Sequence, residues 1–310
     1  MAGNWRKLDG VLLFDKPKGL SSNSALQKIR RLFSAEKAGH TGTLDPMATG
    51  LLPVCFGEAT KFSSGLLDAD KSYDASLRLG QTTTTGDAEG EIVSEIAVGF
   101  SRTDLDRVLM QFRGEIDQMP PMHSALKFQG KPLYEYIRQG ITVERSIRRV
   151  KIYELTLHRW SGNEMDISVR CSKGTYVRTL AEDIGNALGC GAHLAALRRT
   201  AIAHLDLKDA CDLEALISMT EAEREARLLP ITCLMPDMPR LNLDAKEVMR
   251  LAQGQRLGLD TGLPDGKLAL YGPLGFVGTG KQEGRRISSE RLLSSVAKQA
   301  SLKEFTEVVE

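Results

Sequence analysis

The feature that most constrains this chain is the stretch from His40 to Pro53, where glycine and proline recur too often for a long helix. Gly42, Gly50 and the dipeptide Asp45-Pro46 all favour turns, so a loop is expected here between ordered elements. On spacing alone, the economical explanation is that the aspartate of this dipeptide caps backbone amides. A loop held between ordered elements is, however, also where functional side chains concentrate.

Hydrophobic periodicity predicts both strands and helices around this loop. Apolar and polar residues alternate from Tyr73 to Leu79, which is typical of a half-buried strand. Ser101 and Asp104 form a capping-box pattern ahead of apolar residues at helical spacing. This order favours an α+β fold with antiparallel pairing over a strict strand–helix–strand repeat. Further strands are expected at Gly10–Phe14, Val150–Leu157 and Met165–Cys171, and further helices after Ser21-Ser22, from Thr175 to Leu188 and near 213–229.

A proline-rich stretch from Leu234 to Arg240 predicts a linker. With 310 residues, the chain exceeds the usual size of one small domain. Short glycine-rich segments at 254–280 predict a small β-rich module beyond the linker. We therefore expect a larger domain at 1–236 and a C-terminal module at 237–310. Residues 118–149 are turn-rich and basic, and are expected to form an insertion or a long loop.

Composition is neutral on binding partners, but it argues against a zinc site, a disulfide framework and secretion. Lys and Arg number 41 against 40 Asp and Glu, so the net charge of +1 gives no global sign of nucleic-acid binding. The five cysteines are widely spaced without a CxxC pair, which favours free thiols over a disulfide framework or a zinc site. The N-terminus lacks the apolar segment of a secretory signal, and no apolar run is long enough to span a membrane. A cytoplasmic location is expected.

The string GHTGTLDPMATGLLP, from Gly39 to Pro53, resembles the signature of the TruB family of pseudouridine synthases. Other blocks resemble further motifs of the family in the family's order, so that the resemblance covers roughly residues 10–205. A match of this length is far more specific than a short motif. The other blocks are Asp15–Ser22, Asp70–Tyr73, Gly114–Lys127 with Tyr134–Tyr136, Cys171–Leu180 and Gly191–Thr200.

The resemblance implies a pseudouridine synthase fold, with a mixed, mainly antiparallel sheet flanked by helices and loops. The catalytic domain would span 1–236, with 118–149 gripping RNA, and 237–310 would be a PUA-like RNA-binding module. The implied activity is the isomerisation of uridine to pseudouridine at uridine-55 in the T arm of tRNA, by base flipping. The implied partner is the T-arm stem-loop, bound by a monomer without an obligatory protein partner. No cofactor or metal is implied, because the isomerisation is redox-neutral and needs no group carrier.

Two other functions stay open at this point. A guide-RNA-dependent branch of the same superfamily modifies ribosomal RNA. A protein of this kind could also have lost catalysis and kept an RNA-binding or RNA-folding role. The presence together of Asp45, Tyr73 and Arg178 argues against lost chemistry.

By the same resemblance, Asp45 is the catalytic carboxylate. It would act near C1′ of the ribose, either as a nucleophile at that carbon or as a base that removes the 2′ proton, and the sequence does not choose between these routes. Arg178 would orient Asp45 through a charge-assisted hydrogen bond. Tyr73 would stack on the target uracil and assist with the proton at C5. Without the resemblance, an exposed arginine at a helix start and a core tyrosine would be the default interpretations.

Three further residues are assigned to substrate binding by the resemblance. Tyr176 and Leu197 match positions that line the uridine pocket, although each is equally compatible with a core residue. His40 matches a histidine that occupies the space left by the extruded nucleotide, which offsets part of the cost of base flipping. The basic residues concentrated in the insertion and directly after it are expected to contact tRNA phosphates. Its residues are Lys127, Lys131, Arg138, Arg145, Arg148, Arg149 and Lys151.

Overall fold

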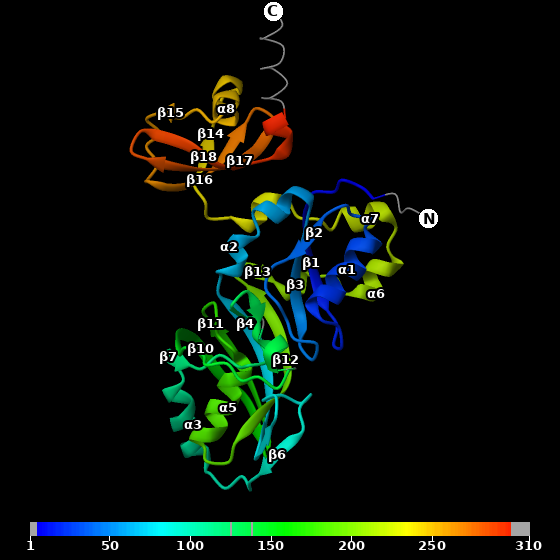
Figure 1. The fold of residues 1–310 in the computed structure, drawn as a ribbon, viewed down its shortest axis with the longest axis vertical. Coiled ribbons are helices and arrows are strands. Elements are labelled where there is room, and N and C mark those ends of the chain that lie inside the picture. Colours follow the sequence, from blue (N-terminus) through cyan, green and yellow to red (C-terminus); the bar gives the residue numbers. More distant parts are fainter. Residues whose placement is uncertain (1–4, 125, 138, 299–310) are drawn as a thin grey trace, which may run out of the picture.

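The largest element of the fold is a nine-stranded mixed sheet (Figure 1). The structure, a computed structural model, describes residues 5–124, 126–137 and 139–298. The strand order is β1-β3-β12-β4-β11-β10-β7, with β2 paired to β3 and β13 paired to β12. Within these described strands, β3 and β12 run parallel and the other neighbours run antiparallel. The strands are β1 Gly10–Lys16, β2 Ala38–His40, β3 Thr49–Phe56, β4 Lys71–Leu79, β7 Gly114–Gln118, β10 Arg148–Ser161, β11 Glu164–Cys171, β12 Ala192–Ile202 and β13 Leu205–Asp206.

Three amphipathic helices bury their apolar faces on this sheet. α3 (Arg102–Gln111) and α5 (Val177–Ala187) contribute to the core formed with β4, β10 and β11, and Figure 1 shows the two helices side by side. α1 (Ser22–Leu32) packs on β1 and β3 through residues such as Ile29. The expected caps are confirmed, because Ser21 accepts a hydrogen bond from the amide of Ser24 and Ser101 forms a capping box with Asp104. These local signals placed the starts of α1 and α3 correctly.

The predicted loop from His40 to Pro53 is shorter in the structure, and this prediction was wrong at both ends. β2 ends at His40, and β3 already begins at Thr49, so the loop covers residues 41–48. β3 is apolar on both faces: Leu52 packs into one core cluster and Leu51 into another. Burial on two sides therefore outweighs the turn preference of Gly50 and Pro53.

The C-terminal module is a separate five-stranded sheet in the order β14-β16-β17-β18-β15, with its own apolar core. It lies at the end of the molecule beyond β1–β3 (Figure 1). Phe276 places its ring 5.5 Å from that of Phe62, and Arg291 donates to the carbonyl of Lys61 at 2.8 Å. The β-rich character predicted for this region is confirmed. Its elements are β14 Arg240–Asn242, α8 Ala245–Ala252, β15 Leu257–Gly258, β16 Gly266–Gly272, β17 Gly275–Glu283 and β18 Arg286–Leu292.

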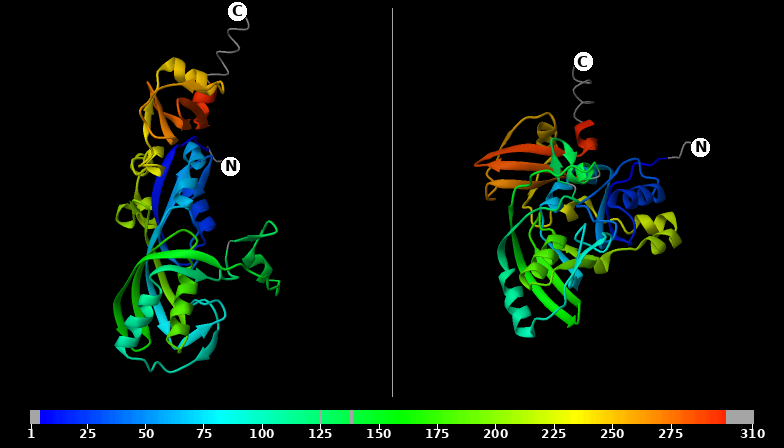
Figure 2. Two further views of the ribbon diagram at one scale, coloured as in Figure 1. Left: turned by 90° about the vertical axis from the view of Figure 1, so that its left-hand side faces the viewer. Right: turned by 60° about the horizontal axis from the view of Figure 1, so that its bottom comes forward.

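The insertion leaves the sheet after β7 and returns at β10, and it projects from the side of the molecule (Figure 2, left, green). It contains a two-stranded ladder of β8 and β9 followed by the short helix α4, which agrees with the expected turn-rich segment. The remaining elements are η1 Gly57–Lys61, α2 Ser64–Leu67, β5 Gln81–Thr83, β6 Ile92–Glu95, β8 Lys127–Phe128, β9 Lys131–Pro132, α4 Leu133–Ile137, η2 Leu207–Asp209, α6 Leu213–Ser218, α7 Glu221–Glu225 and η3 Ile231–Leu234.

Candidate active site

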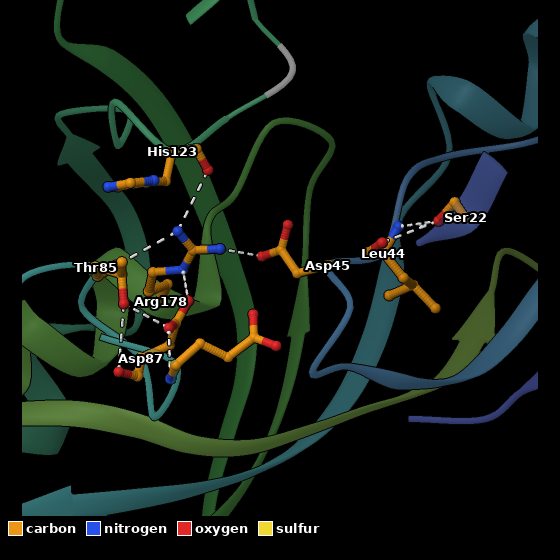
Figure 3. A network of polar contacts seen from close by, with 8 residues as sticks. Ser22, Leu44, Asp45, Thr85, Asp87, His123 and Arg178 are labelled. Carbon is orange, nitrogen blue, oxygen red and sulfur yellow. Dashed lines mark hydrogen bonds and ion pairs between the residues drawn. The ribbon is translucent and has the colours of Figure 1, made fainter. Parts of the chain in front are cut away.

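The loop of residues 41–48 is held in place by the end of β1 and the start of α1. Ser22 Oγ donates to the carbonyl of Leu44 at 2.9 Å and accepts from its amide at 2.7 Å (Figure 3). The amide of Gly19 donates to the carbonyl of Pro46 at 2.7 Å, and Lys16 Nζ reaches the same carbonyl at 3.5 Å. A glycine-containing loop thus gains a defined shape from contacts made by the Asp15–Ser22 block.

Arg178 lies between two aspartates. Its Nη2 donates to Asp45 Oδ2, and its Nε forms an ion pair with Asp87 Oδ2 at 2.9 Å. Its Nη1 donates to the carbonyls of Thr85 at 3.4 Å and His123 at 3.3 Å (Figure 3). The side chains of Arg178 and Asp87 are 7% and 3% exposed, whereas that of Asp45 is 42% exposed. The buried Asp87 and the two carbonyls therefore hold the guanidinium in place. The carboxylate of Asp45, which this guanidinium orients, remains exposed to a ligand.

One cleft of about 250 Å³ brings together five of the six residues that the sequence analysis singled out. These five are Asp45, Tyr73, Tyr176, Arg178 and Leu197. His40 is not among the described residues that line this cleft. It ends β2, and its Nδ1 is buried without a hydrogen-bond partner in the described part of the chain. Burial lowers the pKa of His40, and the charge of Arg199 adds to this effect.

The two tyrosines enter the cleft from different elements. Tyr73 comes from β4 and is 9% exposed, and burial raises the pKa of its hydroxyl. Tyr176 precedes α5, and its backbone is fixed by Gln118, which accepts from its amide at 3.1 Å and donates to its carbonyl at 3.3 Å. Burial also raises the pKa of Tyr176. Leu197 lies on β12 and packs against the main core, so that it supplies an apolar wall.

Charged residues of this site that were not predicted from the sequence include Asp87 and Arg199. Asp87 lies between β5 and β6 in a stretch rich in threonine and glycine, which by itself predicts only a turn. Arg199 lies on β12, is 1% exposed and lines the cleft. It belongs to the Gly191–Thr200 block, but its neighbour Arg198 offers the same local signal. Which of the two arginines is buried depends on how side chains alternate between the two faces of the folded strand.

Some basic residues of the insertion are exposed, whereas others form ion pairs or hydrogen bonds with other residues of the chain. Lys127 and Lys131 are exposed on the small ladder. Arg149 pairs with Asp117 at 3.3 Å, and Arg145 donates to the carbonyl of Pro120 at 2.8 Å. Arg148 and Lys151 are exposed on β10, while Arg138 lies outside the described residues.

The cysteines carry no disulfide. All five are free, with Cys55, Cys171 and Cys190 buried and Cys211 and Cys233 partly exposed. Among residues 5–124, 126–137 and 139–298, no group of three or more His, Cys, Asp or Glu side chains is placed to bind a metal ion. None of the helices in these ranges combines the length and apolar composition that a membrane crossing requires.

Comparison with known families shows the class of this protein, which is that of the pseudouridylate synthases. Residues 30–177 match the N-terminal domain of the TruB family pseudouridylate synthases. Residues 178–236 match the tRNA pseudouridylate synthase B C-terminal domain, and residues 239–293 match the C-terminal domain described as pseudouridine synthase II TruB. The chain belongs to the TruB family.

Close relatives and solved structures support this placement. The chain is 53% identical over 290 residues to the tRNA pseudouridine synthase B of Azoarcus sp. (strain BH72), covering 94% of this chain and 96% of that protein. It is 58% identical over 254 residues to the protein of the same name from Burkholderia mallei (strain NCTC 10247), covering 82% and 84%. A chain in the crystal structure of a Cbf5-Nop10-Gar1 complex superposes with a TM-score of 0.69 at 26% identity, covering 91% of this chain and 84% of that one.

Proposed function

We propose that this chain converts uridine to pseudouridine in tRNA, at uridine-55 of the T arm. The observation that carries the proposal is the accessible carboxylate of Asp45, bound by the buried Arg178 in a cleft that also holds Tyr73. Relatives more than half identical over most of the chain are named tRNA pseudouridine synthase B, which supports tRNA as the substrate. The position within the T arm rests on the family resemblance of the sequence.

The chemistry is assigned to Asp45. Because Arg178 binds Oδ2, Oδ1 is the oxygen available to the nucleoside. The carboxylate acts either by attacking C1′ or by removing the 2′ proton. In both routes the C1′–N1 bond breaks, the uracil rotates and C1′–C5 forms. In the first route an ester bond from Asp45 to C1′ forms as C1′–N1 breaks, and it breaks again as C1′–C5 forms. In the second route Asp45 returns the proton to C2′ as C1′–C5 forms. The proton on C5 is then lost and N1 gains one, so the product is an isomer of the substrate.

The other cleft residues are assigned to the flipped base. Tyr73 stacks on the uracil, and Tyr176 and Leu197 form walls that exclude water while the cleaved base is free. His40 fills the gap that the extruded nucleotide leaves in the RNA. The proposed reaction uses protein groups alone and requires no cofactor.

RNA contact is assigned to the parts that surround the cleft. Residues 1–236 form the catalytic domain, 118–149 grip the RNA, and 237–310 form a PUA-like binding module, of which the structure describes 237–298. Exposed lysines such as Lys127 and Lys131 are available to phosphates, and such contacts make binding sensitive to salt. We expect a monomer that acts on the T-arm stem-loop in the cytoplasm without an obligatory protein partner.

The test is to incubate the purified chain with an unmodified tRNA transcript and to map pseudouridine at single-nucleotide resolution. Conversion at uridine-55 is expected for the wild type, and no conversion is expected for Asp45→Asn, with tRNA binding largely retained. Asp106→Asn is the matched control, because Asp106 is an exposed aspartate on α3 outside the cleft. It should react like the wild type.

The same assay separates the alternatives. A guide-RNA-dependent enzyme would leave the bare tRNA unmodified, and a protein without catalysis would bind tRNA without forming product. If the Asp45→Asn variant still reacts at the wild-type rate, another group carries the chemistry.

A further inference from the structure

Arg199 connects the two sides of the cleft. It lies on β12 opposite Tyr73 of β4, and its side chain is among the largest that are fully buried. Its Nε donates to the carbonyl of Leu51 at 2.7 Å, and its Nη2 donates to the carbonyl of Gly42 at 3.2 Å. The guanidinium also interacts with the Tyr73 hydroxyl of the facing strand, and this interaction opposes the rise that burial causes in the pKa of Tyr73. It therefore contacts both the strand that carries Tyr73 and the loop that carries Asp45.

The charge of Arg199 is buried without a carboxylate beside it. In the part of the chain that the structure describes, Arg178 pairs with two aspartates and Arg198 pairs with Asp15, whereas no carboxylate pairs with Arg199. Burial of a guanidinium is costly unless its donors are used, and burial lowers the pKa of Arg199. Its donors instead bind the carbonyl of Leu51, which is buried in β3, and the carbonyl of Gly42, which lines the cleft.

The direction of any hydrogen bond between Arg199 and Tyr73 follows from chemistry. A guanidinium has five N–H donors and no acceptor, so the Tyr73 oxygen must accept. The hydroxyl hydrogen of Tyr73 is then free for another acceptor. Tyr73 and Arg199 both line the cleft, so the cleft is where that acceptor would lie.

We infer that Arg199 is a positioning residue for this reaction. It fixes the Tyr73 hydroxyl and the Asp45 loop against each other, so that the Tyr73 ring stacks on the uracil and its hydroxyl donates to an acceptor beside the base, while Asp45 faces the ribose. This role rests on the proposed function and adds a specific interaction to it. Arg199 itself does not touch the substrate and acts through Tyr73 and Gly42.

The test is a double-mutant cycle between Arg199→Lys and Tyr73→Phe. Lysine keeps the buried charge, but a single ammonium cannot replace a planar fork that serves three acceptors. Single-turnover rates and dissociation constants are measured on the tRNA transcript. Each single variant should lower the rate about 10- to 100-fold, the range for a hydrogen bond to a charged group, with tRNA affinity changed by less than about threefold. The double variant should react no more than about threefold slower than the slower single variant, because both changes break the same interaction.

Arg198→Lys is the matched control. Arg198 neighbours Arg199 on the same strand but is partly exposed and pairs with Asp15 at 2.6 Å. Its substitution should change the rate by less than about twofold, and its effect should multiply with that of Tyr73→Phe, as for independent sites.

The outcomes are separable. Rate losses of Arg199→Lys and Tyr73→Phe that multiply, or a loss confined to tRNA affinity, would overturn the role of Arg199. If Arg199→Lys does not fold, Arg199→Gln replaces it, with circular dichroism as the check on folding. Failure of both to fold would mean that Arg199 serves the fold alone and would also overturn the inference. A wild type that leaves tRNA unconverted would instead refute the proposed function, and the inference with it.

Discussion

Asp87→Asn tests whether the buried partner of Arg178 is needed by both the fold and the reaction. Oδ1 of Asp87 accepts from Thr85 Oγ1 at 2.6 Å and from the amide of Glu89 at 3.1 Å, and an asparagine oxygen can retain both bonds. Oδ2 faces Arg178 Nε at 2.9 Å, and there the substitution replaces a charged oxygen by an NH₂ group. The change therefore isolates one charge contact in a nearly dry site.

The size of the effect follows from burial. Removal of one partner from a buried ion pair costs about 3–5 kcal/mol. Because Arg178 keeps Asp45 as a second partner, we expect the lower end, about 3 kcal/mol in the free energy of unfolding. The chain offers a matched control in Asp68, whose contact with Lys173 has the same length of 2.9 Å but lies in solvent. Asp68→Asn should produce no measurable change in stability.

Two measurements check this prediction. Urea denaturation gives the free energies of unfolding, and single-turnover conversion of tRNA gives the rate. With one anchor lost, Arg178 should orient Asp45 less well, and the rate should fall while tRNA affinity is retained. Equal stability losses in Asp87→Asn and Asp68→Asn would refute the reasoning from burial. An unchanged rate would refute the coupling of Asp87 to Asp45.

Two further predictions concern stability. Gly50→Ala should abolish folding or lower the melting temperature strongly, because φ is +101° and a Cβ would lie 2.3 Å from the carbonyl oxygen of Arg199. Gly19→Ala is the control: φ is +88° but nothing lies within 4 Å of its Cβ, so it should lower the free energy of unfolding by only about 1–2 kcal/mol. Burial lowers the pKa of Lys16 to about 8 from 10.5, so between these values the unfolded chain holds the extra proton and stability rises with pH. Urea denaturation should show that the free energy of unfolding of the wild type, relative to that of Lys16→Met, rises by on the order of 2 kcal/mol from pH 7.5 to 9.5. A difference between the two proteins that does not change with pH would contradict this prediction.

Elements with a strong local period were predictable from sequence, and elements fixed by distant contacts were not. The strand from Tyr73 to Leu79 alternates because one of its faces is buried and the other is half-exposed, so its pattern alone reveals it. β3 is buried on both faces and contains Pro53, so neither alternation nor propensity marks it as a strand. Its position depends on pairing with β1 and β12, which are close in space but up to about 150 residues away in sequence.

The candidate site shows the same division. The motif that contains Asp45 and the block that contains Arg178 pointed to residues that the structure brings into contact. The resemblance supplied that pairing, and no local property of either segment predicts it. Asp87 and Arg199 are recognisable only in the folded structure, because a turn-forming aspartate and one arginine of an adjacent pair have no distinguishing pattern. Their roles depend on which carbonyls and charges the folded chain places around them.

The site depends on assembly of the sheet around β3, because the loop of Asp45 is held from three sides. The end of β1 and the start of α1 bind it through Lys16 and Ser22, β12 binds it through Arg199, and α5 binds Asp45 through Arg178. β1 and β12 flank the start of β3, while β2 pairs with its other end, so the loop that leads into β3 lies between β1 and β12. A chain that forms its local helices and hairpins without pairing β3 to β12 would have every residue of the site and none of its geometry.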